Sequence, residues 1–145
     1  MLDKRNFYIN GKWIKPFKLN DFEVINPSNE EACAVISLGN KEDVNSAVKA
    51  AKESFPRWSR VEKKYKISLL EKLYEIYESR WNEMAESISM EMGAPIDWAV
   101  TAQTSSGADH IKDFIKRLKE FEFESSFSNE SDNYIAYEPI GVCGL

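Results

Sequence analysis

The residue types best suited to covalent catalysis here are two cysteines, Cys33 and Cys143, which lie far apart and form no Cys-x-x-Cys pair. A cysteine attacks a carbonyl group as the thiolate, which a basic or cationic neighbour must stabilise. Cys33 instead lies between alanines, and Cys143 lies in an apolar run. We expect both to be buried and poorly nucleophilic, because apolar surroundings disfavour the charged thiolate. Two free thiols also fit a reducing compartment, so a cytoplasmic location is expected.

The other ionisable residues predict no paired acid and base. His110 is the only histidine, so the chain lacks the second histidine of a His-based metal cluster, and a satisfied helix position is expected for it. Two sets of charged residues recur at helical spacing and are expected on solvated helix faces: Lys112, Lys116 and Lys119, and Glu71, Glu75 and Glu78.

A glycine-rich phosphate loop is also missing from the sequence. Gly141 and Gly144 are followed by neither the third glycine nor the helix of a dinucleotide-binding turn. We expect these glycines to allow close packing in a sheet. The sequence thus predicts no catalytic and no cofactor-binding residue within residues 1–145.

Charge and hydropathy make two classes of partner unfavourable. The 145 residues include 19 Lys+Arg and 24 Asp+Glu, a formal net charge of −5. Nucleic-acid binding needs a basic face that releases counterions from phosphates, so it is disfavoured. Because no apolar run approaches the roughly 20 residues that cross a bilayer, we expect no membrane partner either.

Residues 1–38 have a sequence pattern that is typical of short strands separated by turns. Asn10 and Gly11 lie between two apolar segments and predict a hairpin over residues 7–14, because both accept the positive φ of a type I′ turn. A strand over residues 22–25 enters a turn at Asn26-Pro27, and residues 32–38 form a further strand.

Residues 40–120 have helical periodicity and predict about four helices. The first is capped by Asn40 and ends at Pro56. The second begins with a capping box of Ser59 and Glu62, and the third ends at Gly93, where a left-handed residue belongs. Four residues of the third helix are expected to face inward: Met84, Ala85, Ile88 and Met92.

The fourth predicted helix starts near Pro95 and keeps its apolar stripe to Leu118. Its middle, residues 101–108, consists of small side chains, so a neighbouring element can approach closely.

The last 25 residues no longer show helical periodicity. A polar loop is expected over residues 128–133, and Tyr134 to Glu138 is a candidate strand that Pro139 ends. Residues 140–145 form an apolar run without polar alternation, which is typical of a strand buried on both faces of a parallel sheet. Such a strand needs parallel neighbours, and residues 1–120 show no βαβ pattern that supplies them. We therefore expect an α/β fold that ends in the first strand of an incomplete doubly wound parallel sheet.

Four short segments are informative through their order and spacing: FYINGKW at residues 7–13, VINPS at 24–28, EMGAP at 91–95 and YEPIGVCGL at 137–145. Together they resemble the N-terminal part of the NAD(P)-dependent aldehyde dehydrogenase superfamily, over essentially the whole chain. The resemblance implies a parent enzyme that oxidises an aldehyde to a carboxylate with NAD or NADP through a cysteine thiohemiacetal. It places the nucleophilic cysteine and the glutamate base beyond Leu145. Residues 1–145 are thus expected to be an inactive N-terminal fragment, part of the coenzyme-binding domain plus the start of the oligomerisation strand, without the catalytic domain.

The same resemblance implies two roles within the chain. It assigns a structural monovalent cation to the backbone carbonyls of Val24 and Ile25 and to the side chain of Glu91. It also assigns the strand from Tyr134 to Glu138 to the association of subunits into a homo-oligomer, for which an exposed strand edge is a suitable template. The alternative is a stand-alone, non-enzymatic helical interaction module derived from the same family.

Overall fold

The N-terminal strands form two small sheets in this computed structural model, which describes residues 1–127 and 133–144. One sheet has the order β1-β5-β4, with β1 parallel and β4 antiparallel to β5. The other is the hairpin of β2 and β3. The strands are β1 (Leu2–Asp3), β2 (Phe7–Ile9), β3 (Lys12–Ile14), β4 (Asp21–Asn26) and β5 (Glu31–Ser37).

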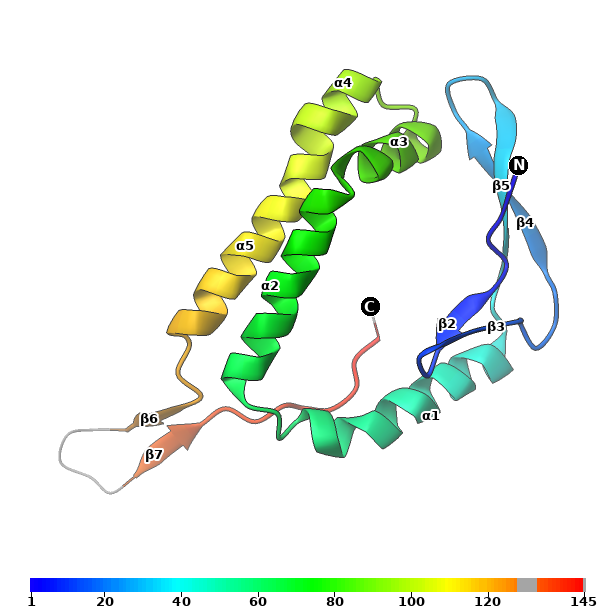
Figure 1. Cartoon of the computed structure of the whole chain (residues 1–145). Helices are drawn as coiled ribbons and strands as arrows, with labels where there is room; N and C mark the ends of the chain where they lie inside the picture. Colours follow the sequence, from blue (N-terminus) through cyan, green and yellow to red (C-terminus); the bar gives the residue numbers. More distant parts are fainter. Residues whose placement is uncertain (128–132, 145) are drawn as a thin grey trace.

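A helical block follows, in which α2 and α5 lie side by side and run in opposite directions (Figure 1). The predicted α/β fold with four helices is confirmed, although the fourth helix is divided into segments. The helical elements are α1 (Lys41–Trp58), α2 (Lys63–Ser79), α3 (Trp81–Met92), α4 (Ile96–Trp98), the π-helical turn η1 (Ala99–Gln103) and α5 (Thr104–Glu120).

The predicted hairpin at Asn10-Gly11 is confirmed. Both residues have positive φ, 52° and 73°, as a type I′ turn requires. Tyr8 pairs with Trp13 across the two strands, with ring centroids 5.2 Å apart.

Asn40 begins α1 with a capping box, which confirms the predicted cap. Its side chain accepts the Asp43 N–H at 3.0 Å, and the Asp43 carboxylate accepts the Asn40 N–H at 3.0 Å. Asp43 also accepts the N–H of Phe17 at 2.9 Å, and it is buried. The carboxylate therefore joins the helix start to the loop between β3 and β4.

The junction of α1 and α2 differs from the prediction at two places. Pro56 lies inside α1, which continues to Trp58, because a proline this close to the end removes a single backbone hydrogen bond. The predicted capping box of Ser59 and Glu62 is wrong. Ser59 caps the C-terminus of α1 and donates its hydroxyl to the Pro56 carbonyl at 3.3 Å, while the Glu62 side chain makes no cap hydrogen bond.

Gly93 ends α3 in the left-handed conformation, as predicted, with φ of 72°. The expected inward face of α3 is confirmed at Ala85, which is fully buried, but Met84 and Met92 are exposed. The reason is that the described neighbours of α3 leave part of its surface open.

The fourth helix contains a feature that the sequence pattern did not indicate, the π-helical turn Ala99–Gln103. Such a turn displaces carbonyl groups from the regular hydrogen-bond ladder. Two aromatic side chains donate to carbonyls in this region, Trp81 Nε1 to Val100 at 3.0 Å and the Tyr77 hydroxyl to Thr104 at 3.0 Å.

Close packing between α2 and α5 depends on small residues, as predicted for residues 101–108. A Cβ atom on Gly107 would lie 2.5 Å from the Tyr77 hydroxyl oxygen. Thr104 and Ala108 are buried in the same segment. Glycine at position 107 thus lets Tyr77 reach the backbone of α5.

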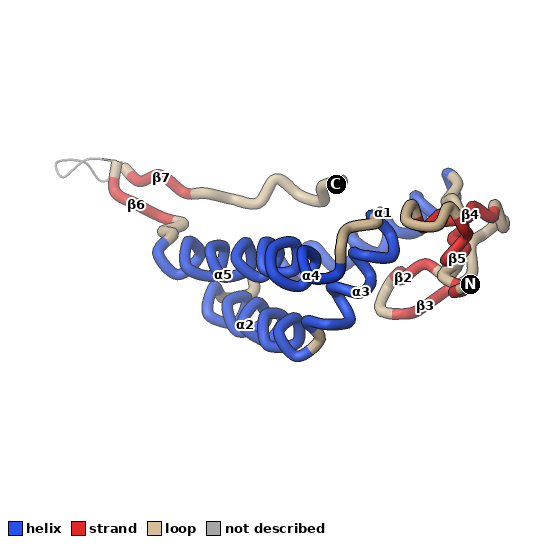
Figure 2. Tube along the Cα trace, turned by 90° about the horizontal axis from the view of Figure 1, so that it is seen from above, coloured by secondary structure: helices blue, strands red, loops and turns tan. Residues whose placement is uncertain are grey.

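After α5 the chain forms an exposed antiparallel pair, β6 (Glu124–Ser126) and β7 (Tyr134–Ala136). Most of the predicted loop over residues 128–133 lies outside the described residues. Figure 2 shows the segment after β7 as a loop rather than a strand. The strand predicted over residues 140–145 is therefore not formed over its described part, and Ile140 is 95% exposed. The described residues offer this segment no strand to pair with, and an unpaired segment is not a strand.

The N-terminal strand β1 carries a pH-dependent contact. The hydrogen bond from the Arg5 side chain, with Nη2 2.7 Å from Asp3 Oδ2, lowers the pKa of Asp3 from its usual 3.8 to about 2. Because the folded-state pKa lies below the unfolded value, the stabilisation is complete above about pH 4 and is lost as the pH falls through about 2.

We expect an NMR titration of the Asp3 carboxyl group to show a midpoint near pH 2. Arg5→Gln is expected to move that midpoint upward towards the usual value, whereas Lys4→Gln serves as a neighbouring control without this contact. A midpoint near 4 in the unmodified chain would contradict the assignment.

Candidate functional site

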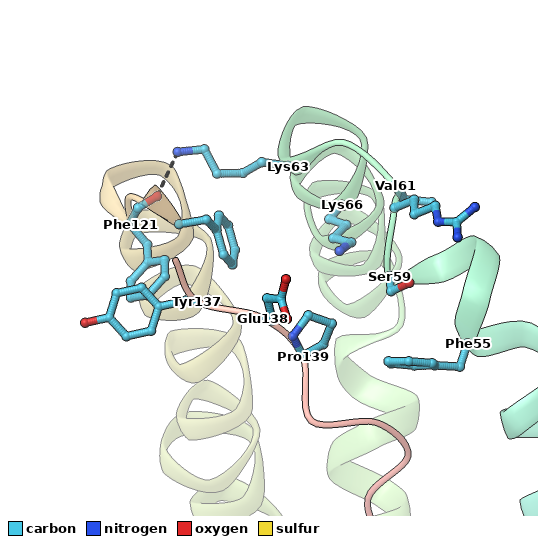
Figure 3. A pocket seen from close by; sticks show the side chains of 11 residues that line it. Phe55, Ser59, Val61, Lys63, Lys66, Phe121, Tyr137, Glu138 and Pro139 are labelled. Atoms are coloured by element: carbon cyan, nitrogen blue, oxygen red, sulfur yellow. Dashed lines mark hydrogen bonds between the residues drawn. The ribbon is translucent and has the colours of Figure 1, made fainter. Parts of the chain in front are cut away.

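A wide hollow lies where the junction of α1 and α2 faces the segment after β7. It has a volume of about 650 Å³. Figure 3 shows Phe55 and Ser59 from the first side, Phe121 and Tyr137 from the second, and Pro139 between them. The hollow is thus formed by segments that are more than 50 positions apart in the sequence.

Lys63 joins the two sides of this hollow, and aromatic contacts hold its second side together. Lys63 Nζ donates to the carbonyl oxygen of Phe121 at 2.9 Å (Figure 3) and to that of Lys119 at 3.3 Å. The Phe121 ring contacts Tyr137, with centroids 5.4 Å apart, and the Tyr137 N–H donates to the Phe123 carbonyl at 2.8 Å. This cluster was not predicted from the sequence, in which the repeated phenylalanines of residues 121–127 are its signal.

The hollow has no catalytic constellation. Its charged lining residues are Arg60, Lys63, Lys66 and Glu138, and it includes no cysteine or histidine. A lysine and a carboxylate on opposite sides can bind or orient a polar group, but covalent acyl chemistry also needs an activated nucleophile.

The two cysteines do not supply that nucleophile. Cys33 is partly buried and donates its thiol to the Val24 carbonyl at 3.2 Å. Cys143 is exposed, so the prediction that it is buried is wrong. The prediction depended on residues 140–145 being a strand inside a sheet, which is not formed here. Both thiols are free, and neither lines the hollow.

Several of the lysines and glutamates that recur at helical spacing on α5 and α2 take part in packing. Lys119 pairs with Glu71 at 2.7 Å, and Lys112 lies over the Tyr74 ring at 4.7 Å, so these two lysines link α5 to α2 rather than forming a free anion-binding face. His110 is exposed, as expected for a histidine on a helix surface. Among the remaining residues of these rows, Lys116 is exposed, Glu75 pairs with Lys72, and Glu78 accepts the Tyr74 hydroxyl.

The residues assigned to a cation lie on elements that meet in the structure. Val24 and Ile25 flank a β-bulge in β4, and Glu91 is exposed on the last turn of α3. The end of α3 lies directly against the turn after β4, because a Cβ atom on Gly93 would lie 2.8 Å from Pro27 Cγ. Carbonyl and carboxylate oxygens suit a hard cation, so the donor types fit. Over residues 1–127 and 133–144 no cluster of three or more His, Cys, Asp or Glu side chains could hold a metal ion.

In the described residues, no helix combines the length and apolarity that a membrane crossing needs.

The chain is 40% identical over 146 residues to the 3-succinoylsemialdehyde-pyridine dehydrogenase of Pseudomonas sp, covering 100% of this chain and 30% of that protein. The chain thus spans about 30% of the length of the curated relatives it matches, in their N-terminal part.

Solved structures of aldehyde dehydrogenases also superpose on this chain. A crystal structure of an aldehyde dehydrogenase from Bartonella henselae superposes with a TM-score of 0.89 and 50% identity, over 91% of this chain and 28% of that one. Aldehyde dehydrogenase C from Pseudomonas syringae, solved in complex with NAD+ and octanal, has a TM-score of 0.83 and 31% identity, over 86% of this chain and 26% of that one. The family model "Aldehyde dehydrogenase family" matches residues 13–145. The chain therefore belongs to the aldehyde dehydrogenase family.

Proposed function

We propose that this chain acts as the N-terminal part of an NAD(P)-dependent aldehyde dehydrogenase that oxidises an aldehyde to a carboxylate. The observation that carries the proposal is the match of residues 13–145 to the family model, together with a relative of Pseudomonas syringae whose structure holds NAD+ and octanal. In this proposal residues 1–145 form part of the structural framework of the enzyme and contribute no catalytic residue. The cysteine nucleophile and the base come from the part of the enzyme that corresponds to the rest of the relatives.

A direct test is steady-state turnover by the 145-residue chain itself. We expect no NADH or NADPH production with NAD or NADP and a panel of aldehydes, because the thiols of Cys33 and Cys143 each donate to a backbone carbonyl, which does not act as a base. The Pseudomonas sp relative is the positive control. Sustained reduction of coenzyme by the chain alone would contradict the proposal.

The alternative, a stand-alone interaction module, makes a different prediction. It requires residues 140–144 to be folded in the chain alone, with slowly exchanging amides. The exposed, unpaired state of this segment supports the enzyme-part proposal instead.

The assigned cation remains part of the proposal. We expect Na+ or K+ to stabilise the contact between α3 and β4, and Glu91→Gln to remove that dependence, because a neutral amide binds a hard cation more weakly than a carboxylate does. Thermal melts in sodium, potassium and tetramethylammonium chloride at equal ionic strength measure the effect. Glu86→Gln, an exposed glutamate on the same helix, is the matched control. An equal response of both variants to the three salts would contradict the assignment.

We also infer that the parent enzyme is a cytoplasmic homo-oligomer that associates through the strand from Tyr134 to Glu138. Support comes from the two-stranded pair of β6 and β7, whose residues are all exposed and whose outer edges carry backbone groups that another chain can pair with. The free thiols agree with a reducing compartment.

A further inference from the structure

The turn between β2 and β3 carries a side chain that can react with its own backbone. Asparagine side chains reach nearby backbone N–H groups, so the Asn10 carboxamide can approach the nitrogen of Gly11. Asn10 is exposed, and neither its side chain nor the Gly11 N–H makes a hydrogen bond with another described residue. A Cβ atom on Gly11 would have no atom within 4 Å. The amide carbon and the nitrogen that can attack it are therefore both unhindered.

The surroundings of this turn leave it room to change conformation. The strands β2 and β3 form a sheet of their own with three residue pairs, and a two-stranded hairpin is only marginally stable in water. The hairpin lies beside α1 (Figure 1), and a hollow of about 300 Å³ separates the turn from that helix. The side of the hollow that α1 forms consists of small side chains: Ala47, Ala50, Ala51 and Ser54. The turn can therefore open on this side without displacing a large side chain.

The other asparagines lack this combination of features. In the 145 residues Asn10 is the only asparagine that is followed by glycine, the residue with the least bulk beside the attacking nitrogen. Asn26 precedes Pro27, which has no backbone N–H. The side-chain oxygens of Asn29 and Asn40 already accept backbone N–H groups, at 3.1 Å and 3.0 Å. These hydrogen bonds hold their carboxamides in place, whereas nothing among the described residues holds that of Asn10.

We propose that Asn10 is a site of spontaneous deamidation that controls the hairpin of β2 and β3. The Gly11 nitrogen loses its proton to water and bonds to Asn10 Cγ, the Cγ–Nδ2 bond breaks, and ammonia leaves with a proton taken from water. A second water molecule then opens the cyclic imide. Attack at Cγ gives aspartate, whereas attack at the main-chain carbonyl carbon gives isoaspartate, in which the backbone continues through the side chain. The reaction consumes only water and requires no other part of the enzyme.

The two products affect the hairpin differently. Aspartate accepts the positive φ of a type I′ turn as asparagine does, so the hairpin persists. Isoaspartate adds a methylene group to the main chain between β2 and β3, and the length and type of a turn fix the register of the strands that it joins. The pairing of Tyr8 with Trp13 is then lost, and the contact of β2 with α1 weakens with it.

Peptide mapping by mass spectrometry tests the site in the 145-residue chain after incubation at physiological temperature and mildly alkaline pH. We expect Asn10 to be converted at least about 10-fold faster than Asn29 and Asn40, because it alone has an unrestrained carboxamide beside glycine. Isoaspartate is expected among the products, and the rate should rise with pH because the attacking nitrogen must lose its proton. Equal loss at the three asparagines would overturn the proposal. Aspartate without isoaspartate would also overturn it, since direct hydrolysis of the carboxamide yields aspartate alone.

Hydrogen exchange of the β2 and β3 amides tests the effect on the hairpin. We expect the isoaspartate fraction, separated by chromatography, to exchange at least about 10-fold faster than the fresh chain, and Asn10→Asp to exchange like the fresh chain. Asn10→Gly is the matched control, because Gly-Gly also forms a type I′ turn but has no carboxamide, so its exchange should be the same before and after incubation. Equal exchange in the isoaspartate fraction and the fresh chain would overturn the control of the hairpin by this site.

Discussion

Gly93→Ala is expected to destabilise the contact between α3 and the turn after β4 by about 3 kcal/mol. Two effects add. Gly93 has φ of 72°, which an alanine adopts only with strain, and the new Cβ would lie 2.8 Å from Pro27 Cγ and 3.3 Å from Ser28 Oγ. Pro27 belongs to a rigid ring in a turn, so it cannot move aside easily. The opening free energy of the α3 C-terminal amides, measured by hydrogen exchange, reports the loss.

Gly11→Ala is the matched control for this experiment. Gly11 has nearly the same φ, 73°, but a Cβ there would have no atom within 4 Å. We expect its cost to be only about 1 kcal/mol, which represents backbone strain alone. If the two substitutions cost the same, the close approach of α3 to Pro27 is not important for stability.

Asp43→Ala is expected to raise the opening rate of the first turn of α1 and to cost about 3 kcal/mol. The substitution leaves two backbone N–H groups, those of Asn40 and Phe17, without their acceptor in a partly buried setting. It also removes a negative charge from the positive end of the helix dipole. Hydrogen exchange of the Val44 amide, which donates to the Asn40 carbonyl at 3.1 Å, measures the local effect.

Glu42→Ala separates charge from hydrogen bonding at the same helix end. The Glu42 carboxylate is exposed in the first turn and accepts no hydrogen bond from the described residues, so we expect a loss of at most about 1 kcal/mol. The stability loss for Asp43→Asn should fall between those for Glu42→Ala and Asp43→Ala, because an amide oxygen can replace one of the two carboxylate acceptors. A loss for Glu42→Ala as large as that for Asp43→Ala would show that the dipole, not the two hydrogen bonds, dominates.

Local backbone structure was predictable from the sequence wherever neighbouring residues alone determine it. The turn at Asn10-Gly11, the cap at Asn40 and the left-handed Gly93 each follow from the conformations that a few neighbouring residues prefer. The predicted capping box of Ser59 and Glu62 was wrong because the end of the preceding helix, and not the local residue types alone, decides the role of Ser59. Its residue types fit, but α1 extends past Pro56 and takes Ser59 as its own C-terminal cap.

Contacts between distant segments were not predictable from spacing. The π-helical turn is accommodated by Tyr77 and Trp81, which come from two other helices, and the hollow beside Phe121 depends on Lys63, 58 positions away. The Phe17 hydrogen bond to Asp43 likewise spans 26 positions. A 3.6-residue period carries no information on such partners.

The sequence by itself determined the family, the α/β class and most element types, because short-range backbone preferences and motif order depend on neighbouring residues. Only the tertiary structure decided which apolar residues are buried. Met84, Met92 and Ile140 all belong to patterns that predict burial, yet all three are exposed. Burial needs a surface to pack against, and hydrophobic free energy is gained only when water is removed from both surfaces.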